Sequence, residues 1–74
     1  MDIFDVLRQG AIVCGNGHEI VTVNDSDMIV WEEIAGQWQE SGSISRIDGA
    51  GGAPWSHAPL RVLQAKARDL LGVP

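Results

Sequence analysis

The first ten residues follow a helical pattern of apolar positions. Four apolar side chains share one side of a helix, at the spacing i, i+1 and i+4 with one neighbour that widens the stripe: Ile3, Phe4, Leu7 and Val6. Asp2 is placed to cap this helix, and Asp5 lies in its first turn, where a negative charge is favourable. Gly10 suits the left-handed conformation that ends many helices. The pattern therefore predicts a short helix over residues 1–10.

Residues 11–47 change to short β-rich runs separated by turn signals. Asn16-Gly17 is a strong hairpin signal, and Ala35-Gly36 predicts another tight turn. The polar segment 24–27 offers the side-chain hydrogen bonds typical of a turn. We expect an antiparallel meander of 3–5 short strands, three strong and one or two weaker, with runs at 11–14, 18–23, 28–33, 37–40 and 43–47. Such strands fit an open sheet and an SH3-like barrel equally well.

The rest of the chain predicts a glycine-rich loop over residues 48–55 and a second helix over residues 56–72. Ser56 opens this helix, Pro59 falls in its first turn, where a missing N–H costs nothing, and Gly72 ends it. The expected apolar face consists of Leu60, Leu63, Ala67, Leu70 and Leu71. The predicted fold class is α+β, a single domain over residues 1–74 with a helix on each side of the meander.

Composition indicates a small folded protein. Hydrophobic residues make up 45% of the 74 residues, which favours a packed core over disorder. The one cysteine cannot form an internal disulfide, and the N-terminus lacks the pattern of a signal peptide. The longest apolar run has four residues, far short of the about 20 that span a membrane. We therefore expect a soluble cytoplasmic protein.

Negative charge is concentrated in the first two thirds of the chain. Nine of the ten acidic residues lie within residues 1–48 and are Asp2, Asp5, Glu19, Asp25, Asp27, Glu32, Glu33, Glu40 and Asp48. Only Arg8 and Arg46 oppose them, so this part carries a net charge of −7, whereas residues 49–74 carry +2. Such a distribution repels nucleic acid and attracts basic protein surfaces.

The candidate sites for chemistry are weak. The glycine run 49–52 lacks the lysine and the helix start of a phosphate loop. Cys14, His18 and His57 do not follow a zinc-ligand spacing, and Cys14 is more typical of a small core residue. Glu40 could approach Glu32 across the Ala35-Gly36 turn, but two carboxylates alone do not indicate acid–base catalysis. We expect no enzyme activity, no cofactor and no metal site.

The three tryptophans differ in their surroundings. Trp31 shares a strand face with Ile29, which predicts that it fills the core. Trp38 lies between two glutamines and Trp55 follows the loop, so either can be partly exposed, and exposed tryptophans are enriched as interface anchors.

These observations favour a small acidic protein-binding module. The predicted contact residues are the charges Asp25, Asp27, Glu32, Glu33 and Glu40, with Trp38 as anchor. In size, charge and organisation the chain resembles small proteins of bacteriophages and mobile elements, including anti-CRISPR proteins that block a nuclease complex. The acidic set itself favours an inhibitor whose carboxylates imitate nucleic-acid phosphates and occupy a basic groove of a nucleic-acid-handling complex, and the resemblance implies that it acts in the cytoplasm of a bacterial host.

Two alternatives remain open. The chain could be an assembly adaptor, forming a homo-oligomer such as a homodimer, or a small virion component. It could also bind nucleic acid through Arg61, Lys66 and Arg68 of its last helix, since the expected element order is that of the double-stranded-RNA-binding domain. Three cations are few for groove binding, which disfavours direct contact with nucleic acid.

Overall fold

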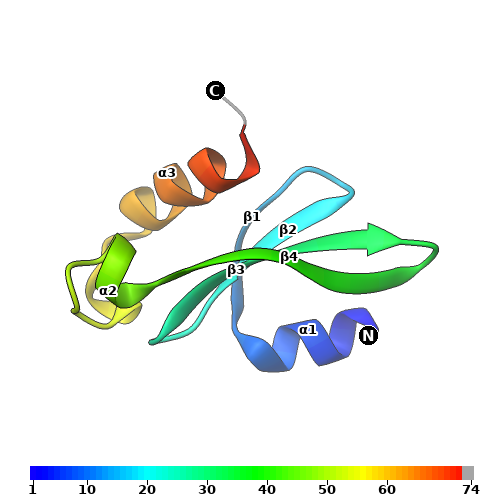
Figure 1. Cartoon of the computed structure of the whole chain (residues 1–74), viewed down its shortest axis with the longest axis horizontal. Coiled ribbons are helices and arrows are strands. Elements are labelled where there is room, and N and C mark those ends of the chain that lie inside the picture. The colour runs from blue at the N-terminus through cyan, green and yellow to red at the C-terminus, as the bar shows by residue number, and fades with distance from the viewer. Residues whose placement is uncertain (73–74) are drawn as a thin grey trace.

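In the computed structural model, which describes residues 1–72, an antiparallel sheet lies between two helices (Figure 1). Its four strands follow each other in chain order and are β1 (Ala11–Gly15), β2 (Glu19–Val23), β3 (Asp27–Ile34) and β4 (Gln37–Ser45). Helix α1 (Ile3–Gln9) contacts one face of the sheet, and helix α3 (Leu60–Leu71) covers the other. The α+β prediction is confirmed. The sheet is open, because β1 and β4 remain its two edges.

Strand β4 joins the two weaker runs that the sequence separates. Ser41-Gly42 resembles a turn in sequence, but pairing with β3 keeps the segment extended. Val30 pairs with Gly42 while Trp31 pairs with Glu40, so Ser41 is the extra residue of a β-bulge. The Ser41 hydroxyl donates to the Val30 carbonyl at 3.4 Å. The bulge offsets by one residue the pairs on its far side from the hairpin turn, from Val30–Gly42 to Asp27–Ser45.

The segment after β4 differs from the prediction. Residues Arg46–Gly49 form a short helix, α2, where the sequence pattern predicts the end of a strand and the start of a loop. Ser45 caps this helix, because its hydroxyl oxygen accepts the N–H of Asp48 at 3.3 Å. The spacing of these two residues is a helix-start signal that outweighs the β-rich composition before it.

Helix α3 begins four residues later than predicted. Residues Trp55–His57 form a separate 3₁₀ helix, η1, and α3 starts at Leu60 with Pro59 as its N-cap. The residue before a proline is disfavoured in the helical region, and Ala58 is accordingly extended (φ −82°, ψ 139°). At the other end, the prediction for Gly72 is confirmed: it is left-handed (φ 72°), and its N–H bonds to the carbonyls of Arg68 and Asp69.

Gly10 serves a different purpose from the one predicted. Its φ of 164° is extended rather than left-handed. A Cβ at this position would lie 2.6 Å from the carbonyl oxygen of Val23, so glycine is required by the close approach of two backbones.

Two apolar clusters form on opposite faces of the sheet, because successive strand residues point to opposite sides. The larger cluster lies under α3 and contains Val21, Met28, Val30, Trp55, Leu63 and Ala67. The smaller lies under α1 and contains Val6, Ile29 and Trp31, which confirms the core position of Trp31. The Trp31 indole N–H donates to the buried Thr22 hydroxyl at 2.9 Å. No helix within residues 1–72 has the length and apolar character needed to cross a membrane.

Candidate protein-binding surface

The β3–β4 hairpin projects from the body of the molecule (Figure 1). We call its outer part, residues 32–40, the acidic arm. It contains three glutamates and no basic residue, and every side chain in it is exposed except Trp38, which is half-buried. Its two-residue turn has positive φ at both Ala35 (52°) and Gly36 (78°), the geometry of a type I′ hairpin. This turn matches the twist of the strands and holds the arm together as a two-stranded ribbon.

The register divides the glutamates of the arm between its two faces. Glu33 pairs with Trp38, and Glu40 pairs with Trp31, so these residues lie on the face that carries α1. Glu32 pairs with Gln39 and lies on the opposite face. The sequence-based expectation that Glu40 approaches Glu32 is therefore wrong, because the two-residue turn at Ala35-Gly36 sets a register in which Glu40 lies opposite Trp31.

Trp38 lies on the α1 face of the arm, and its side chain is half-buried. Its ring packs against the small cluster of Val6, Ile29 and Trp31. Its backbone N–H donates to the carbonyl of Met1 at 2.8 Å, which ties the start of the chain to β4. The indole is thus held in place while part of it remains accessible between Glu33 and Glu40, the arrangement of a rigid anchor with a charged rim.

Glu19 completes the acidic surface on the α3 side. It pairs across the strands with Glu32, so two like charges face each other directly. The next pair along contains the hydrogen bond from Glu33 N–H to His18 O (2.8 Å), which makes Glu19 and Glu32 a non-hydrogen-bonded pair, where side chains are closest. Like charges in such a position destabilise a sheet. Sequence reasoning missed this partner for Glu32, although the turn signal at residues 24–27 places the two strands side by side.

Asp25 and Asp27 lie at the far end of β3 from the arm. They belong to the β2–β3 turn, which is organised by Asn24: its side-chain oxygen accepts the N–H groups of Ser26 and Asp27, both at 2.8 Å. The Asp25 carbonyl accepts the backbone N–H of Trp55 at 3.2 Å. At about 3.3 Å per residue, β3 separates Asp27 from the tip of the arm by roughly 23 Å. The six predicted contact residues therefore form two groups: Glu32, Glu33, Glu40 and Trp38 on the arm, and the two aspartates at the opposite end.

The carboxylates of the sheet have no cationic partners. Between residues 19 and 45 the chain has six acidic residues and no lysine, arginine or histidine. Within residues 1–72 the one ion pair joins Arg8 to Asp5 at 2.7 Å, far from the arm in sequence and on α1. The N-terminal ammonium donates to Gln37 Oε1 at 2.9 Å and offsets part of the negative field of the arm, but within residues 1–72 no cation forms an ion pair with its glutamates.

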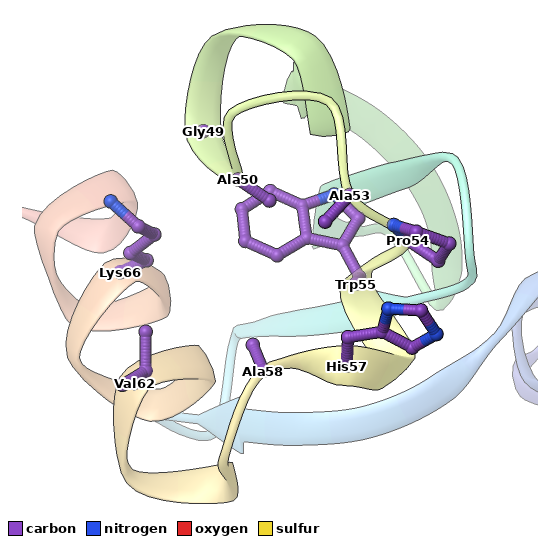
Figure 2. A pocket seen from close by; sticks show the side chains of 9 residues that line it. All are labelled: Gly49, Ala50, Ala53, Pro54, Trp55, His57, Ala58, Val62 and Lys66. Carbon is purple, nitrogen blue, oxygen red and sulfur yellow. The ribbon is translucent and has the colours of Figure 1, made fainter.

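A hollow in the surface lies beside Trp55 (Figure 2). Its volume is about 250 Å³, and small apolar side chains of the loop and of α3 form most of its wall, among them Ala50, Ala53, Ala58 and Val62. The expectation that Trp55 could be partly exposed is wrong, because this indole is fully buried in the larger cluster. Its N–H has no partner among the described residues. Figure 2 shows the Lys66 ammonium turned away from the indole, so the hollow gathers no set of reactive groups.

The candidate metal ligands lie apart. Cys14 packs half-buried against the larger cluster, His18 is exposed in the β1–β2 turn, and His57 lies in η1 beside the hollow. Among residues 1–72 no three histidine, cysteine or acidic side chains gather as they would around a metal ion. The glycine run 49–52 leads into η1 rather than into the start of α3, which is not the geometry of a phosphate loop.

Comparison with protein-family models, curated proteins and solved structures finds no match to this chain. The surface must therefore be interpreted from its own geometry.

Proposed function

We propose that this chain is a non-enzymatic protein-binding module whose acidic arm docks on a basic surface of another protein. One observation carries the proposal: Glu33 and Glu40 flank the half-buried Trp38 on one face of a projecting hairpin, and Glu32 lies on its other face. Within residues 1–72 none of these three glutamates forms an ion pair. Charges of one sign on an exposed element steer association with a surface of the opposite sign. The tryptophan supplies the apolar anchor that such interfaces place among polar contacts.

The pair Glu19–Glu32 supports the same proposal, because the fold keeps two like charges together at a cost in stability. Direct opposition of two like charges costs folding free energy and contributes nothing to the core. A basic side chain of a partner placed between the two carboxylates would convert this repulsion into attraction. We therefore expect the partner to approach the arm from both faces, Glu19 and Glu32 on one side and Glu33 and Glu40 on the other.

In its most specific form, the proposal is that the arm enters a basic groove that otherwise holds nucleic acid. A narrow ribbon with carboxylates on both faces presents negative charge much as a nucleic-acid strand presents phosphates. An inhibitor of this kind, encoded by a phage or mobile element, would act by occupying the groove. Binding would weaken steeply with salt, because the attraction is Coulombic.

Two double variants that each remove two charges test the proposal. Glu33→Gln/Glu40→Gln neutralises the arm, whereas Asp25→Asn/Asp27→Asn neutralises the opposite end of β3. Each tagged protein is used to capture proteins from a bacterial lysate at low and at high salt, and the captured proteins are identified by mass spectrometry. We expect the wild type and the Asp25/Asp27 variant to capture a basic nucleic-acid-handling protein at low salt. Added DNA should displace this protein from both. The Glu33/Glu40 variant should lose it.

Two outcomes contradict the proposal. Unchanged capture by the Glu33/Glu40 variant would show that the arm is not the contact surface. Recovery of nucleic acid in place of protein would transfer the function to the basic residues of α3.

The single variant Glu32→Gln separates binding from stability. Because it removes the repulsion from Glu19, we expect it to raise the free energy of unfolding by about 0.5 kcal/mol. The same change should weaken partner capture. Urea denaturation followed by circular dichroism measures the first effect, and a Glu32→Gln protein no more stable than the wild type would refute the repulsion.

A further inference from the structure

The outer side of α1 is apolar and uncovered. Phe4 is 67% exposed and Leu7 44% exposed, three residues apart on one side of the helix, while Val6 is buried on the side that packs against the sheet. Met1 and Ile12, on either side of this helix in the chain, are also exposed large hydrophobic residues. Four of the seven such residues in the described chain thus fall within its first twelve positions. We call this set, Met1, Phe4, Leu7 and Ile12, the α1 patch.

We propose that the α1 patch is the contact surface of a homodimer in which α1 packs antiparallel against α1 of a second copy. This inference does not rest on the function proposed for the acidic arm. A small domain buries a modest fraction of its surface on folding, and self-association is an effective way to cover apolar residues that its own core cannot reach.

The charges on α1 favour a second copy over other occupants. The helix carries Asp2 and Asp5 at its start and Arg8 in its last turn. A two-fold axis through the patch would place each Arg8 beside the aspartates of the other copy, whereas a parallel arrangement would oppose like charges. Arg8 is free to take part, because its side chain is 74% exposed even while it contacts Asp5.

The α1 patch carries less negative charge than the acidic arm, which it meets at Met1, whose carbonyl accepts the Trp38 N–H. Residues 1–12 carry a net charge of −1, against −6 for residues 19–45, so two copies repel each other less at the patch than at residues 19–45. The outer side of α1 faces away from the sheet, opposite to α3 (Figure 1). Antiparallel pairing there leaves the Glu32 face of each arm uncovered, and a dimer would present two such faces.

The expected affinity is modest. A standard stable interface buries about 800 Å² on each partner, and one short helix with its neighbours supplies less than that. We therefore expect reversible association with a Kd in roughly the micromolar to submillimolar range. Salt should change it little, because the central contacts are apolar.

Sedimentation equilibrium of the full chain tests the proposal over about 5–500 µM, a range that brackets weak dimers. The average mass of the wild type should rise from 8.0 kDa toward twice that value. Phe4→Ser should raise the Kd at least about tenfold, and Arg8→Glu should also raise it. Ile47→Ser is the matched control: Ile47 is 73% exposed but lies on α2, so its loss should leave the Kd unchanged.

Because Phe4, Arg8 and Ile47 are all exposed, these variants should fold, which circular dichroism checks. A wild type that stays monomeric at the highest concentration overturns the proposal. So does a Phe4→Ser protein that dimerises as well as the wild type. Loss of association in Glu33→Gln/Glu40→Gln, with Phe4→Ser unaffected, would replace it with head-to-tail contact between the acidic arm and the basic α3.

Discussion

The contact between Gly49 and Trp55 allows a sharp test of how the loop, α2 and the core fit together. A Cβ on Gly49 would lie 2.6 Å from Cη2 and 2.7 Å from Cζ2 of Trp55, and 3.0 Å from Cδ1 of Ile44. Carbon atoms prefer separations of about 3.5–4.0 Å, so the methyl group of alanine would be compressed by about 1 Å. Trp55 is fully buried in the larger cluster, so the indole must shift toward the neighbouring hollow or the backbone of α2 must move.

The expected cost of Gly49→Ala follows from two opposing effects. Overpacking a well-packed core costs about 1–3 kcal/mol. Alanine is favoured over glycine in a helix by about 1 kcal/mol, but Gly49 is the last residue of α2, so less than that is recovered. We expect a net loss of about 1–2 kcal/mol in the free energy of unfolding, which for a domain of this size lowers Tm by roughly 5–15 °C.

Gly42→Ala is the matched control. A Cβ on Gly42 meets no atom within 4 Å, and this glycine does not have a positive φ. Its replacement should change stability by no more than about 0.5 kcal/mol. Urea denaturation followed by circular dichroism compares the two variants. If Gly49→Ala is as stable as Gly42→Ala, then Trp55 does not pack under Gly49, and the account of the larger core is wrong.

Three further predictions address the α1 side of the sheet and the arm. Thr22→Val should lower the free energy of unfolding by about 1–3 kcal/mol, because it leaves the buried Trp31 N–H without an acceptor. Thr22→Ser keeps the hydroxyl and should lower it less, which urea denaturation followed by circular dichroism measures. The N–H of Asp5 donates to the Asp2 carboxylate at 2.9 Å, and this hydrogen bond lowers the pKa of Asp2. The stability that the cap contributes is therefore complete above about pH 4, the ordinary pKa of aspartate, and it is lost as the pH falls through the lowered pKa. An NMR titration of the Asp5 amide checks this, and a midpoint at or above the ordinary value for aspartate would contradict it. Ala35→Asn places a residue that tolerates a positive φ at the first central position of the type I′ turn. We expect the free energy of unfolding to rise by about 1 kcal/mol, and calorimetry should show a higher Tm. An unchanged Tm would argue against the turn geometry.

Local signals in the sequence predict most of the secondary structure. The hairpin turns at Asn16-Gly17 and Ala35-Gly36 are correct, because turn geometry depends on a few adjacent residues. The end of α3 at Gly72 is correct for the same reason. The missed helix α2 also had a local signal, the Ser45 cap, which the β-rich composition before it obscured.

The candidate surface depended on information of longer range. The sequence predicts an excess of unpaired acid and a tryptophan among polar residues, but not which carboxylates share a face. The two-residue turn at Ala35-Gly36 pairs Glu40 with Trp31, and this register separates Glu40 from Glu32 and places it beside Trp38. The sequence-based prediction did not apply this register to the three glutamates. The same prediction grouped Asp25 and Asp27 with the arm, although they lie at the opposite end of an eight-residue strand.

The sequence by itself determined the order of elements, their turns and the distribution of charge, because each depends on residue type and on neighbours within a few positions. Only the tertiary structure decided the open sheet, the register of β4 and the burial of Trp55. These features depend on pairing between strands and on the close fit of segments distant in the chain, such as Gly49 against an indole, which no local pattern encodes.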